Sequence, residues 1–97
     1  MPTYVSLLNW TDQGVKNFKD TVDRAAKAEE MMGKLGVTFK DIYWTLGPYD
    51  IVAIVEAPDQ ESATAALLQV ATLGTVRSTT LPAFNRDEMA RVIEKVS

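Results

Sequence analysis

The sequence contains neither cysteine nor histidine among its 97 residues. The absence of cysteine excludes disulfide bonds and thiolate nucleophiles, and the two absences together exclude cysteine- and histidine-ligated zinc sites. The absence of histidine also excludes imidazole general bases, serine–histidine–aspartate triads and histidine-ligated haem. Any chemistry carried by this chain therefore rests on carboxylates, on lysine and arginine, and on hydroxyl groups.

Basic charge and long apolar runs are also scarce. Lys and Arg number 10 against 13 Asp and Glu, which gives a net charge of −3. A nucleic-acid-binding protein normally carries a basic excess, so we expect no nucleic-acid partner. No segment approaches the ~20 apolar residues of a transmembrane helix, and the N-terminus lacks the basic region of a signal peptide. We therefore expect no membrane partner and a cytoplasmic protein.

Motifs for cofactors and metals are missing as well. The sequence has no Gly-x-Gly-x-x-Gly, no P-loop ending in Gly-Lys-Ser/Thr and no Gly-x-Ser-x-Gly. It also lacks the Asp-x-Asp-x-Asp-Gly spacing of a calcium-binding loop. We therefore expect neither a cofactor nor a metal ion.

What is present is the composition of one soluble globular domain spanning residues 1–97, with 46% apolar and 24% charged residues. Two periodicities alternate along it, one of two residues and one of 3.6. The alternation in residues 37–46 slips at Lys40 and Asp41, which predicts a bulge, and Pro82 predicts an interruption or an end. The predicted order is strand 3–10, a short helix, a longer helix from about 21, strand 37–46, strand 50–57, helix 60–74, strand 75–84 and a last helix capped by Asn85 and Glu88.

This β-α-β-β-α-β-α order predicts an α+β fold of the ferredoxin-like type with an extra C-terminal helix. Such a fold has a four-stranded antiparallel sheet with two helices on one face. The other face is also apolar and aromatic in places, from Val5 or Tyr4, Trp44 and alternate residues of strand 50–57. An apolar face of this kind needs a cover, and a second copy is the favoured one. We expect a homodimer of the dimeric α/β-barrel type, or a higher homo-oligomer.

Three segments of the chain resemble the GYD-domain family of small bacterial and archaeal proteins. They are TDQGVKNFKD, YWTLGPYDIVAIVEAPD and LGTVRSTTLPAF. The resemblance covers residues 3–95, and the letters that name the family stand here as Gly47, Tyr49 and Asp50. It implies a ferredoxin-like, dimeric α/β-barrel fold and no established reaction.

A more distant resemblance concerns the effector-binding module of leucine/asparagine-responsive bacterial regulators, over residues 37–82. In that module the hairpin turn and neighbouring strands help to form an amino-acid site at a subunit interface. The resemblance therefore implies a stand-alone sensor or binding module. The residues that carry it are Gly47, Tyr49, Asp50, Leu73, Gly74, Val76, Thr79 and Thr80.

Five residues are candidates for a ligand site. Asp50 accepts either backbone N–H groups of its own turn or a ligand ammonium group, and Tyr49 beside it offers a hydroxyl. Trp10 supplies an aromatic wall where the first strand ends, and Lys16 adds charge near the helix start that follows. Arg77 lies in a polar stretch of the fourth strand and needs a carboxylate partner. Asp50 and Glu56 are the natural partners, and a ligand carboxylate is the alternative.

Three functions compete. The first is a homo-oligomeric module that binds an amino acid or a carboxylate between the sheet and its dimer cover. The second is a cofactor-independent enzyme of the dimeric α/β-barrel type, which requires a perturbed carboxyl group facing a roomy pocket. The third is a purely structural or interaction subunit.

Overall fold

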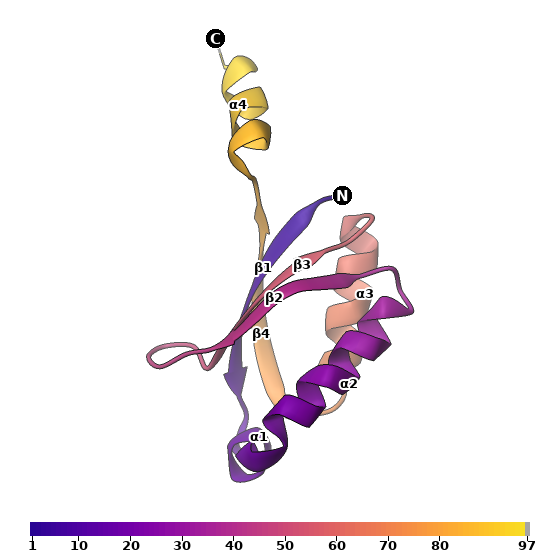
Figure 1. The fold of residues 1–97 in the computed structure, drawn as a ribbon, viewed down its shortest axis with the longest axis vertical. Helices are drawn as coiled ribbons and strands as arrows, with labels where there is room; N and C mark the ends of the chain where they lie inside the picture. The colour runs from indigo at the N-terminus through magenta and orange to yellow at the C-terminus, as the bar shows by residue number, and fades with distance from the viewer. Residues whose placement is uncertain (97) are drawn as a thin grey trace.

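The computed structural model describes residues 1–96. In this part of the chain, strands and helices alternate in the order that the sequence predicts (Figure 1). The elements are β1 (Thr3–Trp10), α1 (Asp12–Lys16), the 3₁₀ turn η1 (Phe18–Asp20), α2 (Thr21–Gly33), β2 (Thr38–Trp44), β3 (Ile51–Glu56), α3 (Gln60–Ala71), β4 (Val76–Ala83) and α4 (Arg86–Glu94).

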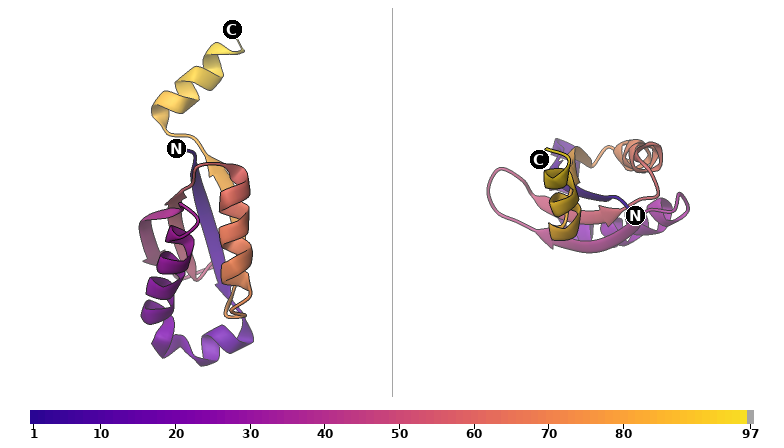
Figure 2. Two further views of the ribbon diagram at one scale, coloured as in Figure 1. Left: turned by 90° about the vertical axis from the view of Figure 1, so that its right-hand side faces the viewer. Right: turned by 90° about the horizontal axis from the view of Figure 1, so that it is seen from above.

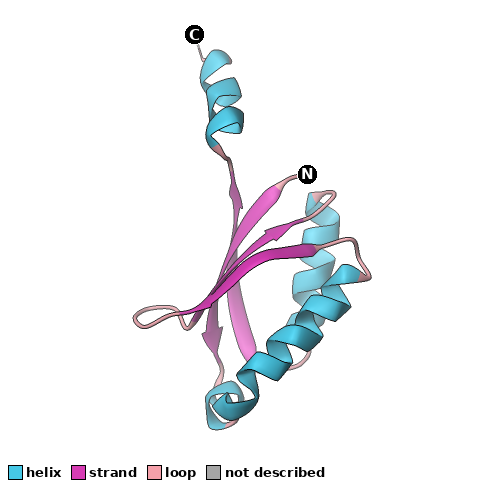
Figure 3. Cartoon of the chain, viewed as in Figure 1, coloured by secondary structure: helices cyan, strands magenta, loops and turns pink. Residues whose placement is uncertain are grey.

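The four strands form one antiparallel sheet in the order β2-β3-β1-β4, in which β1 pairs with both β3 and β4. Helices α2 and α3 lie side by side over one face of this sheet, and the other face is bare (Figures 2 and 3). This arrangement confirms the predicted ferredoxin-like α+β fold.

The alternation of side chains along β1 divides the sheet into two faces. Tyr4 and Ser6 point toward α2 and α3 and are buried, whereas Val5 and Leu7 point to the bare face. We call the bare face the open face. Its side chains come from all four strands and include Val5, Leu7, Asn9, Asp41, Tyr43, Val52, Ile54, Arg77, Thr79 and Leu81.

Trp44 does not lie on the open face, and this corrects an expectation from the sequence. Its indole Nε1 donates a hydrogen bond to Thr21 Oγ1 of α2 at 3.0 Å, on the covered side of the sheet. The cause is the predicted bulge, which lies between Phe39 and Asp41. An extra residue in one strand moves every later side chain to the opposite face.

Helix α2 ends at Gly33, and Gly36 adopts a positive φ of 78° in the turn that follows. The fourth strand differs from expectation. Pro82 neither ends nor interrupts the fourth strand, because β4 is an edge strand and one of its sides needs no hydrogen-bond donors.

Helix α4 projects beyond the end of the sheet and covers neither face (Figures 1 and 2). Its predicted capping box is present: Asn85 Oδ1 accepts from the Glu88 N–H at 2.8 Å, and Glu88 Oε1 accepts from the Asn85 N–H at 2.9 Å. Because α4 projects in this way, the chain is elongated and measures 51 × 31 × 17 Å along its principal axes. Among the described residues no helix combines the length and apolar character required to cross a bilayer.

Candidate functional site

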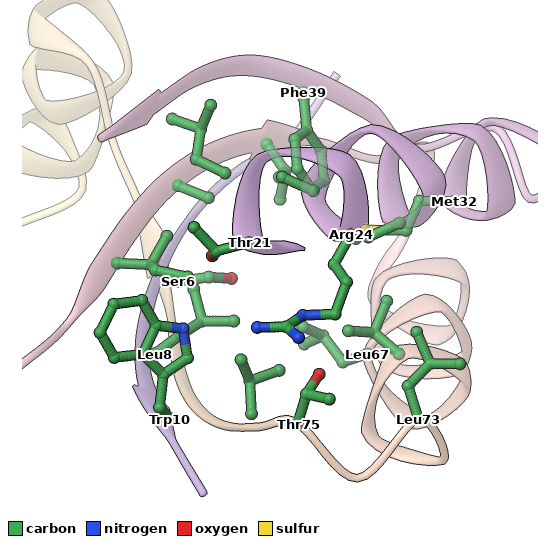
Figure 4. Close-up of a pocket in the computed structure, with 18 residues that line it drawn as sticks. Ser6, Leu8, Trp10, Thr21, Arg24, Met32, Phe39, Leu67, Leu73 and Thr75 are labelled. Atoms are coloured by element: carbon green, nitrogen blue, oxygen red, sulfur yellow. The ribbon is translucent and has the colours of Figure 1, made fainter. Parts of the chain in front are cut away.

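A cavity of about 70 Å³ lies between the covered face of the sheet and helices α2 and α3 (Figure 4). Most of its wall is apolar. Small side chains from the helix and the facing strand leave the space open, since Ala25 and Ala28 of α2 and Ala53 of β3 all line it. The larger apolar side chains of the wall are Leu8, Trp10, Met32, Phe39, Ile42, Ile51, Val55, Leu67, Val70, Leu73 and Val76.

Trp10 brings an unpaired donor to this wall. Its backbone N–H donates to Asp50 Oδ2 at 2.9 Å, which fixes the residue at the end of β1. Its indole Nε1 is buried and has no hydrogen-bond partner among the described residues. A buried donor without an acceptor costs about 1–3 kcal/mol, so this N–H group favours a bound molecule that carries an acceptor.

Arg24 of α2 brings a positive charge to the same wall. Its Nη1 donates to the carbonyl oxygen of Asn17 at 2.9 Å, and its Nη2 donates to that of Gly14 at 3.2 Å. These two bonds hold the guanidinium in place at the cavity, where it faces the indole nitrogen of Trp10 (Figure 4). Neither Asp nor Glu is among the lining residues. The cavity therefore offers two donors and a positive charge to an acidic or carbonyl group.

Beside Thr75, which lines the cavity, the start of α1 makes a tight contact with the segment that precedes β4. Thr11 donates through its backbone N–H to the Thr75 carbonyl at 3.1 Å and through Oγ1 to the Gly74 carbonyl at 2.6 Å. Gly14 fits against this segment only because it lacks a side chain, since a Cβ there would lie 2.0 Å from the Thr75 carbonyl oxygen. The sequence segment TDQG thus positions both Thr75 and the carbonyl that holds Arg24.

Asp50 fixes the hairpin between β2 and β3. Its carboxylate accepts the Trp10 N–H, and its own N–H donates to the Leu8 carbonyl at 2.8 Å. Within the turn, Thr45 Oγ1 donates to the Tyr49 carbonyl at 2.6 Å. Gly47 has a φ of 117°, which residues with a side chain rarely adopt. Asp50 and Tyr49 therefore shape the turn, and neither lines the cavity.

Lys16 and Arg77 lie away from the cavity as well. Helix α1 is only five residues long, so Lys16 falls in its last turn rather than near its start, and it is exposed. Arg77 lies on the open face, opposite Asn9. The carboxylate partners proposed for it are engaged elsewhere, since Glu56 Oε1 pairs with Lys40 Nζ at 3.8 Å and Asp50 bonds to Trp10.

Of the five residues chosen from the sequence, the structure places only Trp10 at the cavity. This cavity lies on the other side of the sheet from the predicted dimer-interface pocket, which stays a prediction. Sequence reasoning missed Arg24. A signal for it exists, because Thr21, Arg24, Ala28 and Met32 recur at helical spacing and all line the cavity.

The described residues give little support to a catalytic reading of the cavity. No carboxylate lines it, and Asp50 and Glu56, which the enzyme hypothesis requires, lie outside it. No cluster of three or more Asp or Glu among residues 1–96 has the arrangement of a metal site.

Comparison with known proteins identifies the family of this chain and proteins that share its fold. The chain is 36% identical over 84 residues to the glutamine synthetase and cystathionine β-lyase binding protein of Thermus thermophilus, covering 86% of this chain and 88% of that protein. A solved structure from the same organism superposes with a TM-score of 0.57 at 28% identity, over 88% of this chain and 95% of that one.

A regulator gives a closer superposition at lower identity. The feast or famine regulatory protein of M. tuberculosis, solved with L-methionine, has a TM-score of 0.67 and 16% identity, over 88% of this chain and 51% of the regulator. At that identity the match shows the shared fold alone. The family model described as the GYD domain matches residues 4–93, nearly the whole chain. The chain therefore belongs to the GYD domain family.

Proposed function

We propose that this protein is a small-molecule binding module that takes a short aliphatic carboxylate into the cavity between its sheet and its two packed helices. The observation that carries the proposal is the pair of donors on the cavity wall, the unpartnered Trp10 indole N–H and the Arg24 guanidinium. A carboxylate accepts from both, and hydrogen bonds to charged groups contribute about 1.5–3 kcal/mol each.

The size and the charge of the cavity narrow the ligand class. A volume of about 70 Å³ is roughly half that of an apolar cavity known to hold benzene. It therefore suits an alkyl group of about three or four carbons, whose carboxylate stays at the donors on the cavity wall. An amino acid also carries an ammonium group, and no carboxylate lines the cavity to receive one. This favours a simple carboxylate over the corresponding amino acid.

The module is proposed to act as a homodimer in which each copy covers the open face of the other. Val5, Leu7, Val52, Ile54 and Leu81 give that face its apolar character, and Leu81 is 47% exposed. In this arrangement the cavities lie on the outer sides of the two sheets, so each copy binds its ligand independently of the dimer contact.

The experiment compares three probes of one shape by thermal unfolding and by tryptophan fluorescence: isovalerate, its neutral amide, and valine. We expect isovalerate to stabilise the protein most, since a ligand at a hundred times its Kd adds about 2.7 kcal/mol. Trp44→Phe removes the second indole, so that the remaining fluorescence reports on Trp10. The amide and valine are expected to bind at least tenfold more weakly.

Matched variants test the location of the site. Arg24→Met removes the guanidinium at the cavity, and Arg77→Met makes the same change on the open face. We expect Arg24→Met, and Trp10→Phe by a smaller factor, to weaken isovalerate binding, while Arg77→Met leaves it unchanged. Equal loss in both Arg variants would contradict a site in the cavity, and the absence of any stabilisation by the carboxylates would contradict the proposal as a whole.

A second function, binding to enzymes, is favoured by one observation: the relative with 36% identity is named for binding glutamine synthetase and cystathionine β-lyase. The test is retention of each purified enzyme, from the organism that encodes this chain, on the immobilised protein, with serum albumin as the control. Retention of neither enzyme argues against this function and leaves the cavity proposal unaffected.

A further inference from the structure

Helix α4 leaves an apolar stripe uncovered. Met89 is 46% exposed and Ile93 is 58% exposed, and Phe84 just before the helix is 62% exposed. The helix has nine residues, whereas isolated helices shorter than about 12–15 residues are marginal in water. A helix this short, with apolar side chains along one side, is expected to pack that side against a surface.

Within this chain, α4 packs against neither face of the sheet. Only Phe84 and Asn85 connect β4 to α4, and two residues reach at most about 7 Å. The capping box further fixes Asn85 in an extended conformation, with φ −76° and ψ −179°. In this conformation α4 continues away from the end of β4, where Thr3 pairs with Ala83 and Tyr4 with Pro82.

The total surface of the chain is larger than that of a compact monomer of the same mass. It exposes 6684 Å², whereas a compact monomer of 10.7 kDa exposes about 5,500 Å². Its radius of gyration is 14.5 Å against about 12.5 Å for a compact chain of this length. The surplus of roughly 1,200 Å² exceeds the ~800 Å² that each partner contributes to a standard stable interface.

We propose that α4 is an exchanged arm: in a dimer, the stripe of Met89, Val92 and Ile93 packs against the open face of a second copy. A two-fold axis makes the exchange reciprocal, because each copy presents one arm and one uncovered face. This inference rests on the homodimer of the proposed function, but it is independent of the ligand cavity on the other side of the sheet.

The test uses two variants of the full chain that both add negative charge to the helix. Met89→Glu with Ile93→Glu places two carboxylates on the apolar stripe, and Arg91→Glu makes an equal change in charge on the opposite side of the helix. Light scattering and sedimentation across a range of concentrations measure the dimer. We expect the double variant to weaken dimerisation at least tenfold and Arg91→Glu to leave it near the wild-type value.

Disulfide trapping locates the arm, because the natural chain contains no cysteine. A tagged Ile93→Cys chain is mixed with an untagged Leu7→Cys chain, whose new thiol lies on the open face. The control partner is Leu68→Cys, which is exposed on α3. We expect oxidation to join Ile93→Cys to Leu7→Cys and not to Leu68→Cys.

Each result has a defined meaning. If the double variant dimerises as well as the wild type, or if trapping selects position 68, the exchanged arm is wrong while a sheet-to-sheet dimer stands. If the wild type stays monomeric at every concentration, the arm and the dimer are both wrong. Ligand binding in the cavity is decided separately by the isovalerate titration.

Discussion

At the residue scale, Gly14 allows two segments to pack closely because it has no side chain. A Cβ at this position would lie 2.0 Å from the Thr75 carbonyl oxygen. Adding a side chain therefore forces α1 or the segment before β4 to shift. We predict that Gly14→Ala lowers the free energy of unfolding by about 1–3 kcal/mol. Denaturant unfolding measures this loss, and the same variant should bind isovalerate more weakly because Thr75 lines the cavity.

Gly33 provides the matched control. It is the last residue of α2, and a Cβ there meets nothing within 4 Å. Gly33→Ala should therefore leave stability unchanged or raise it by up to about 1 kcal/mol, since alanine loses less entropy in a helix. Equal destabilisation by the two substitutions would contradict the steric explanation.

The site was partly predictable at the residue scale. Trp10 follows from its position at the end of an apolar strand, and the turn-fixing role of Asp50 is one of the two alternatives that its sequence position leaves open. Arg24 was missed because an arginine on a helix is usually solvated, and only the side chains opposite show that this one faces a cavity. The residue type indicates which interactions a side chain can make, but the packing of the elements decides where in the fold it makes them.

At the element scale, the start of α3 depends on its N-cap residue, Asp59, whose carboxyl group titrates. Asp59 Oδ1 accepts from the Ser62 N–H at 2.7 Å. The hydrogen bonds from the Ser62 backbone and then from its side chain lower the pKa of Asp59 below its ordinary value of 3.8, and weak desolvation opposes them. A lowered pKa in the folded state means that the cap stabilises α3 fully above pH 3.8 and less as the pH falls below it.

Asp59→Asn keeps a good capping residue and removes this titration. We predict that the wild type melts at a higher temperature than Asp59→Asn near pH 6 and that the difference shrinks as the pH falls below about 4. Thermal unfolding across this range checks the prediction. A difference that stays constant with pH would show that the ionised cap contributes nothing.

Elements with local signals were predicted most closely. The capping box of α4 depends on neighbours in sequence, so Asn85 and Glu88 mark it correctly. Trp44 was assigned to the wrong face because the bulge at Lys40 could be seen only as a slip in the pattern. A bulge reverses the faces of the residues that follow it, and its position depends on pairing with β3.

At the scale of the whole molecule, stability should depend on concentration. A dimer that unfolds to separate chains gains stability with each tenfold rise in concentration, by mass action. We predict a rise in Tm of roughly 2–5 °C per tenfold for the wild type, and a smaller rise for Met89→Glu with Ile93→Glu. Scanning calorimetry or fluorescence melts over a wide range of concentration would measure it, and a constant wild-type Tm would contradict the dimer.

The overall fold was predictable because alternating periodicities and turn residues leave few arrangements of four strands and two covering helices. The cavity was not. Its volume depends on small residues on facing elements, Ala25 and Ala28 on a helix and Ala53 on a strand. Each alanine suits its element equally well in a filled core, so only the assembled layers show that space remains between them.

The projecting arm also determines how the molecule moves through solution. A particle that measures 51 × 31 × 17 Å has a larger Stokes radius than a sphere of the same mass, so a lone chain elutes early from a sizing column. Packing each arm against a partner makes the particle rounder as its mass doubles. Dimerisation through α4 should therefore lower the frictional ratio while it raises the sedimentation coefficient.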